Sequence, residues 1–135
     1  MTLRPAHIPA MALAVTAGAC APVDEGALDF SRAQFDYLGS ETRLLDDDIV
    51  QFTVKMQGAN GIAVVAEYAE CVAAQYTLIR GYGFARHVRT TVEERDGLWH
   101  GDAFYTVSDA LPRGRRQIDA EVVVAACNEN KVPTV

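Results

Sequence analysis

The chain has 135 residues, of which half are apolar and 22% are charged, and its formal net charge at pH 7 is −6. This composition excludes a disordered chain and leaves room for one domain with a single hydrophobic core. The acidic balance also disfavours nucleic acid as a partner.

The first residues are typical of an export signal. Arg4 precedes a short apolar run, and small residues that include Ala17 and Ala19 stand directly before Cys20. Small residues before a cysteine resemble the lipobox of bacterial lipoproteins, in which the thiol is acylated and becomes the new N-terminus. The same residues also fit an ordinary secretory cleavage site, which would give a soluble periplasmic protein. We expect a signal peptide over residues 1–19, a tether over 20–26 and one domain over 27–135.

The first part of the domain predicts a strand followed by a long helix. Residues 27–38 favour a short helix or an irregular segment, whereas residues 49–57 alternate apolar and polar side chains as a half-buried strand does. Residues 62–80 have the period of an amphipathic helix, with Asn60 as the expected cap and Gly81 as the residue that ends it. The expected core face of the helix consists of Val65, Tyr68, Val72, Gln75, Tyr76 and Ile79, with Glu67, Glu70 and Thr77 opposite.

A β-hairpin is the strongest local signal in the second part. Asp96 and Gly97 lie between two strand-like runs, residues 84–95 and 98–108, and predict a type I′ turn. With these two residues as the loop, one face of the hairpin pairs Val92 with Gly101, Thr90 with Ala103, Val88 with Tyr105, and Arg86 with Val107. The other, wetter face pairs Glu93 with His100, Thr91 with Asp102, Arg89 with Phe104, and His87 with Thr106. We expect Val88, Tyr105 and Val107 to be buried, and Glu93, His100 and Asp102 to be exposed.

After a basic turn over residues 110–116, residues 117–127 alternate and predict a last strand. The expected fold is therefore α+β: a mostly antiparallel four-stranded sheet with one long helix packed on one face, in the order β-α-β-β-β.

Two cysteines remain if Cys20 carries a lipid. Cys71 and Cys127 are then a candidate disulfide pair of an exported protein, or alternatively two small buried thiols.

No metal, cofactor or catalytic residue is assigned. His87 and His100 are expected on one face but about 20 Å apart, too far to bind the same ion. Residues 80–87 resemble the RNP1 motif of RNA-recognition domains, yet the expected helix end at Gly81 displaces them from the middle of a sheet. Arg113, Arg115 and Arg116 form a basic cluster that, with Phe104, is the candidate binding surface for lipid phosphates or an acidic partner.

Taken together, the leader, the alanine-rich helix with one cysteine, the Arg80–Phe84 helix exit and the apolar run near the C-terminus resemble small, uncharacterised envelope lipoproteins of alphaproteobacteria. The resemblance implies an envelope protein held at the membrane through a lipid on Cys20 and acting as an interaction module, with an envelope protein as a possible partner. A small-ligand binder that uses a cleft between helix and sheet is the alternative, and a small hydrolytic enzyme is a third hypothesis.

Overall fold

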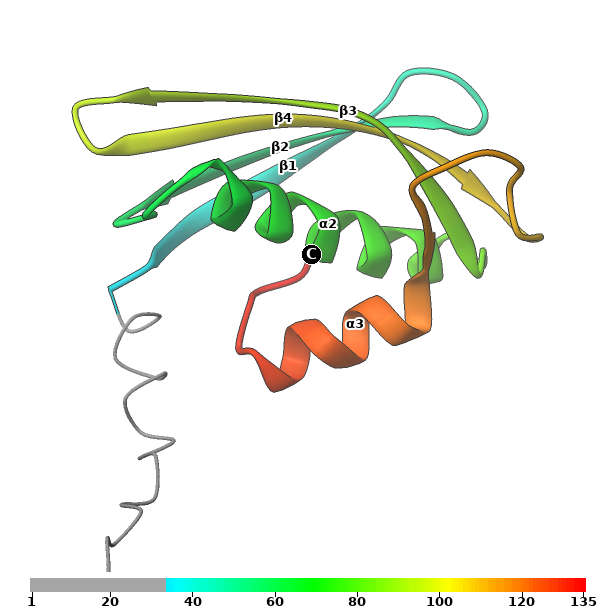
Figure 1. Cartoon of the computed structure of the whole chain (residues 1–135). Helices are drawn as coiled ribbons and strands as arrows, with labels where there is room; N and C mark the ends of the chain where they lie inside the picture. The colour runs from blue at the N-terminus through cyan, green and yellow to red at the C-terminus, as the bar shows by residue number, and fades with distance from the viewer. Residues whose placement is uncertain (1–33) are drawn as a thin grey trace, which may run out of the picture.

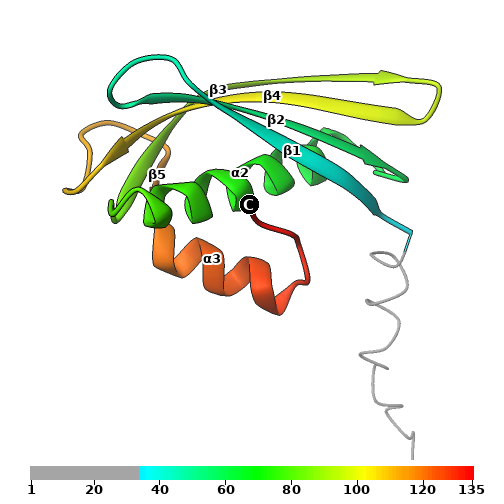
Figure 2. The same cartoon turned by 180° about the vertical axis from the view of Figure 1, so that it is seen from behind.

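The computed structural model describes residues 34–135, so Cys20, the expected leader and the tether lie outside the described residues. Five strands form one antiparallel sheet in the order β1-β2-β4-β3-β5. The sheet curls as a half-barrel over the long helix α2, and the second helix α3 packs on the other side of α2 (Figures 1 and 2). The expectation of four strands and one helix is therefore wrong, because a strand near the start and a helix at the end were both missed.

The first hairpin joins β1 (Asp36–Leu44) to β2 (Ile49–Gln57). β2 confirms the predicted strand, and its alternate residues Val50, Phe52, Val54 and Met56 are fully buried. β1 was not predicted. It is an edge strand with an irregularity between Tyr37 and Gly39, and its side chains are mostly exposed, so its sequence has no clean alternation. The helix or irregular segment expected over 27–38 is wrong for its last residues, and residues 27–33 lie outside the described part.

Helix α2 (Ile62–Ile79) confirms the predicted helix, and Gly81 follows it with a φ of 81°. Its N-cap residue is Gly61 without a side-chain cap, so the role expected of Asn60 is wrong. Thr77 is fully buried and Ile79 is 61% exposed, the reverse of the prediction. Helix α3 packs on α2 and covers part of the helix face that a four-stranded fold would leave in water, where Thr77 was expected to be exposed.

Strands β3 (Phe84–Arg95) and β4 (Leu98–Ser108) form the predicted hairpin, with Asp96 and Gly97 at φ values of 54° and 82°. The predicted register holds from Arg95–Leu98 to Arg89–Phe104. It then shifts by one residue between His87 and Arg89. Beyond this bulge His87 is opposite Tyr105 and Ala85 is opposite Val107, so the expected pairs Val88–Tyr105, Arg86–Val107 and His87–Thr106 are wrong.

The burial prediction for the hairpin is confirmed in part. Tyr105 and Val107 are buried and Glu93 is exposed, but His100 and Asp102 are only half-exposed. Val88, expected in the core, is 46% exposed because it is the extra residue of the bulge.

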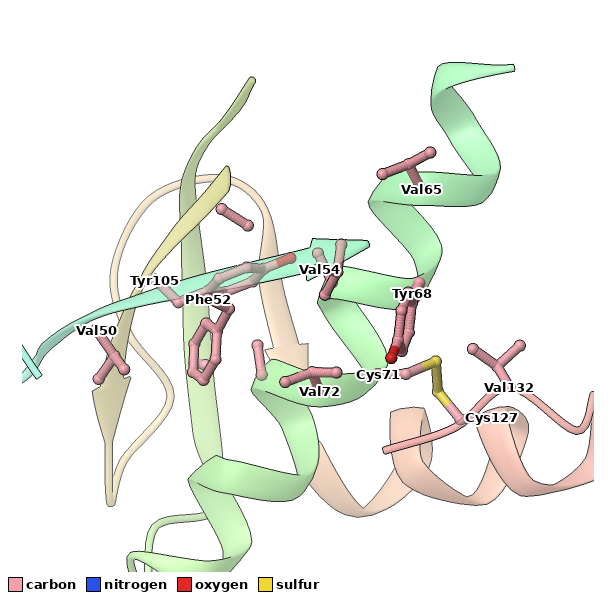
Figure 3. Close-up of a cluster of buried hydrophobic side chains, with 14 of the residues drawn as sticks. Val50, Phe52, Val54, Val65, Tyr68, Cys71, Val72, Tyr105, Cys127 and Val132 are labelled. Carbon is pink, nitrogen blue, oxygen red and sulfur yellow. A yellow bond between two sulfur atoms is a disulfide. The ribbon is translucent and has the colours of Figure 1, made fainter. Parts of the chain in front are cut away.

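The core lies between the concave face of the sheet and α2 (Figure 3). Phe52 has edge-to-face ring contacts with Tyr105 and Tyr76, at centroid distances of 6.0 and 5.4 Å. Gly101 lies where α2 approaches the sheet closely, since an added Cβ there would be 2.7 Å from Cγ1 of Val65.

The predicted last strand is wrong after its first three residues. β5 (Gln117–Asp119) pairs with the start of β3, and α3 (Ala120–Glu129) follows at once. Asp119 begins the helix, because its Oδ1 accepts hydrogen bonds from the backbone N–H groups of Glu121 and Val122 at 3.1 and 3.3 Å.

A disulfide joins α2 to α3. The Cα atoms of Cys71 and Cys127 are 5.9 Å apart and their sulfur atoms are bonded, so the candidate pair is confirmed and the alternative of two free thiols is wrong. Both residues are buried, and Val132 packs beside them (Figure 3).

Candidate functional site

The bulge in β3 decides which side chains meet at the end of the sheet where β3 begins. Strand residues alternate between the two faces, and an extra residue at Val88 reverses the alternation of everything before it. His87 therefore turns to the concave face, whereas Arg86 is opposite Thr106 on the convex face. His100 lies on the convex face, so the expectation that the two histidines share a face is wrong.

His87 is held by three neighbours on the concave side. Its Nε2 is 2.7 Å from Oγ1 of Thr90, its ring has an edge contact with Tyr105 at 5.1 Å, and its Nδ1 is 3.4 Å from Nη1 of Arg116. An arginine only donates hydrogen bonds, so Nδ1 is the acceptor and Nε2–H donates to Thr90. Burial and, secondarily, the charge of Arg116 lower the pKa of His87, which keeps the ring neutral near pH 7.

The loop between β4 and β5 is fixed at both of its ends. Oγ of Ser108 donates to the carbonyl of Ala110 at 2.7 Å, Nε2 of Gln117 donates to the carbonyl of Pro112, and His87 N–H donates to the carbonyl of Arg116 at 3.0 Å. Arg116 itself has a φ of 63°. These bonds hold a basic loop in which Arg113, Arg115 and Arg116 are all exposed.

Two further arginines lie on β3, and one of them adjoins this loop. A Cβ on Gly114 would be 3.7 Å from Cδ of Arg86, so the loop passes beside the Arg86 side chain. Arg89 lies on the same face of β3 beyond the bulge, and its guanidinium is 5.0 Å from the ring centre of Phe104. We call these five arginines of the loop and of β3 the arginine face: Arg86, Arg89, Arg113, Arg115 and Arg116.

The structure places Arg113, Arg115 and Arg116 in one loop at the end of the sheet where β3 begins, and it places Phe104 inside β4, opposite Arg89. Sequence reasoning missed Arg86 and Arg89 as members of the group. It placed Arg86 on the core face, because a single register was assumed for the whole hairpin. The sequence pattern contains no signal for the bulge, so it could not place Arg86 on the convex face.

A second polar group lies nearer the hairpin turn. Oδ1 of Asp102 accepts hydrogen bonds from Gln51 at 3.1 Å and Thr53 at 2.7 Å, so its carboxylate is satisfied within the sheet. Beyond it, Lys55, Glu93 and His100 line part of an open hollow of about 540 Å³, and Nε2 of His100 is buried without a hydrogen-bond partner in residues 34–135. No group of three or more His, Cys, Asp or Glu side chains in these residues could hold a metal ion.

The perturbed titratable groups of the core do not form an open reactive site. Burial, and then the charge of Glu70, raise the pKa of Tyr105, while burial and Glu67 raise the pKa of Glu70. Tyr105 is 2% exposed and is packed between rings, so no substrate reaches it in this conformation.

Comparison with known proteins places the chain in a family. The model of the YNQ4 C-terminal domain matches residues 37–131. The chain belongs to this family. The matched residues run from the second residue of β1 to just past the end of α3, so they include all of the described strands and helices except Asp36.

A relative has been described only as the uncharacterised 26.9 kDa protein in the nqo8 5′ region of Paracoccus denitrificans, an alphaproteobacterium. It is 28% identical over 105 residues, which are 78% of this chain and 41% of the relative. The chain therefore spans less than half the length of that protein. No solved structure matches the chain.

One helix of the described part, α2, is long and apolar enough to cross a membrane. The core helix of a globular domain passes the same test, and α2 packs on the sheet through one face and is bridged to α3 through another. Its apolar composition is accounted for by this packing.

Proposed function

We propose that this chain is an exported envelope protein whose folded domain is tethered to a membrane by a lipid on Cys20 and acts as an interaction module. The observation that carries the proposal is the bond between Cys71 and Cys127. Disulfides form and persist in oxidising compartments such as the bacterial periplasm, and they are rare in the cytosol.

The bridge also bears on the third cysteine. With Cys71 and Cys127 paired, Cys20 is the one thiol left in the sequence, and it follows the small residues that a lipid-modifying signal peptidase requires. A free thiol is prone to oxidation in an oxidising compartment, and acylation of the sulfur removes the free thiol.

The packing between helix and sheet and the hydrogen bonds of His87 favour an interaction surface over a ligand cleft or a catalytic centre. The close approach of Val65 to Gly101 leaves no cleft between helix and sheet at that point. His87 is neutral and engaged with Thr90 and Arg116, as expected of a structural clamp for the basic loop. In contrast, the arginine face projects charge outward from a rigid sheet, as interaction surfaces do.

The test is fractionation of bacteria that express the full chain or its Cys20→Ser variant. We expect the unaltered chain to stay with the membranes after a 1 M salt wash, and the variant to be released. At this salt concentration the Debye length is about 3 Å, so electrostatic attraction to the membrane surface is screened. Intact mass should show a chain that begins at Cys20, carries the lipid and has lost two hydrogens to the disulfide. The matched control is Cys71→Ala with Cys127→Ala, which keeps Cys20 and should remain membrane-bound. Retention of Cys20→Ser after the salt wash would disprove the anchor.

A further inference from the structure

The arginine face is an unneutralised basic surface on an acidic chain. Arg113 and Arg115 make no hydrogen bond or ion pair within residues 34–135, although acidic residues outnumber basic ones by 18 to 12 in the sequence. Beside these charges stand two exposed aliphatic side chains, Leu111 at 62% and Val88 at 46%. In the loop, charge without an internal partner and apolar area without cover therefore occur within five residues, at Leu111, Arg113 and Arg115.

We propose that the arginine face binds the anionic headgroups of a phospholipid bilayer and that Leu111 enters the headgroup layer. The inference deepens the proposed function, because it assumes a chain that meets a membrane, but it does not require the lipid on Cys20. Guanidinium groups bind phosphate through paired N–H donors, and several of them near an anionic surface act together. An aliphatic side chain among cations adds the burial that a purely electrostatic contact lacks.

The loop is built to present these groups. Its hydrogen bonds to Ser108, Gln117 and His87 fix the backbone at both ends, so little ordering is required when Arg113 and Arg115 meet a surface. Arg86 and Arg89 come from the rigid strand beneath it. A nucleic acid is disfavoured by the acidic remainder of the chain.

Nearby acids set a limit on the binding. Asp109 is in the loop, and the turn that contains Asp46, Asp47 and Asp48 adjoins the end of β4 through the bond from Val107 N–H to the carbonyl of Asp48 at 2.9 Å. Asp102 is engaged by Gln51 and Thr53, and Asp119 by the start of α3. We therefore expect binding to strongly anionic bilayers at low salt and little binding to zwitterionic ones.

Both membrane contacts fit one surface. Asp36, at the start of β1, lies at the end of the sheet where the Asp96-Gly97 turn joins β3 to β4. The basic loop lies at the opposite end (Figure 1). β3 has 12 residues, and the sheet is therefore about 40 Å long. The 14 residues from Ala21 to Gln34 reach at most about 50 Å, so the chain is long enough for the domain to lie along the membrane with its arginine face against it.

The test uses the mature Cys20→Ser chain, residues 20–135, which carries neither the apolar leader nor the lipid, in sedimentation with vesicles. One vesicle preparation contains equal parts of phosphatidylglycerol and phosphatidylcholine, and the other contains phosphatidylcholine alone. We expect binding to the first at low salt and its loss in 0.5 M salt. Arg113→Gln with Arg115→Gln should weaken the partition coefficient roughly tenfold or more, since each basic residue near an anionic surface contributes severalfold.

The matched control removes the same charge elsewhere. Arg80→Gln with Lys131→Gln changes two exposed basic residues that follow the helices α2 and α3, outside the sheet, and should weaken binding less than twofold. Leu111→Trp should shift its emission to the blue on anionic vesicles only. The proposal would be overturned by equal binding to both vesicles or by equal losses in the two double variants. Complete competition by polyglutamate would also overturn it, in favour of an acidic protein partner. Release of Cys20→Ser from washed cell membranes is a separate result, so failure of either proposal is recognised independently.

Discussion

Val65 of α2 packs directly against Gly101 of β4, so closely that a side chain at residue 101 has no room. Cγ1 of Val65 would be 2.7 Å, and Cγ2 of Val54 3.1 Å, from a Cβ on residue 101. Glycine is required here for space and not for its backbone conformation. The rigid contact also holds the hairpin of β3 and β4 over the helix, and so fixes the strand that supports the arginine face.

We expect Gly101→Ala to destabilise the fold by about 1–3 kcal/mol, the usual cost of overpacking a filled core. Chemical denaturation with the Cys20→Ser background measures the change. Gly83→Ala is the matched control, because a Cβ there has nothing within 4 Å. In a double-mutant cycle, Val65→Ala should recover part of the loss, and simple additivity would contradict the proposed contact.

Breaking the bridge between Cys71 and Cys127 should cost about 4 kcal/mol, because the bond closes a loop across a sequence separation of 56 residues and restricts the unfolded chain. The double variant Cys71→Ala with Cys127→Ala, compared by thermal unfolding with the oxidised protein, gives this value. Reducing agent should lower the stability of the oxidised protein and leave that of the variant unchanged. If the two proteins unfold at the same temperature, the bridge does not contribute as argued.

His87 should make stability depend on pH. The fold lowers its pKa, through burial first and Arg116 second, so folding favours the neutral ring. Its contribution is complete above the unfolded pKa of about 6.5 and is lost as the pH falls through the lower folded value, because the unfolded chain binds the proton first. The difference in melting temperature between the unaltered protein and His87→Gln should shrink below pH 6.

The sequence pattern predicted three elements correctly, and it failed where a β-bulge changed the strand register. β2, α2 and the Asp96-Gly97 turn follow directly from spacing and turn chemistry. The bulge at Val88 could not be predicted, since the sequence around it alternates as well in one register as in the other. It turned His87 inward and placed Arg86, which was expected on the core face, on the convex face, whereas Arg89 keeps its predicted position opposite Phe104.

The prediction of a strand for the C-terminal segment was wrong for a different reason. Val122, Val123 and Val124 are β-branched and favour a strand, and in a short apolar run period alone does not separate a strand from a helix. Packing of α3 on α2 and the bridge to Cys71 override that propensity. The one local signal for a helix was Asp119, an N-cap residue immediately before the apolar run.

Asp119→Ala should therefore loosen α3 specifically. Its Oδ1 accepts from the N–H groups of Glu121 and Val122, and without it both donors lose their partner at a helix that is poor in intrinsic propensity. We expect a loss of about 1 kcal/mol in unfolding free energy and faster amide exchange in α3 than in α2. Asp119→Asn, which keeps an acceptor oxygen, should retain most of the stability. Equal losses in the two variants would mean that the carboxylate acts through its charge at the helix start and not as a cap.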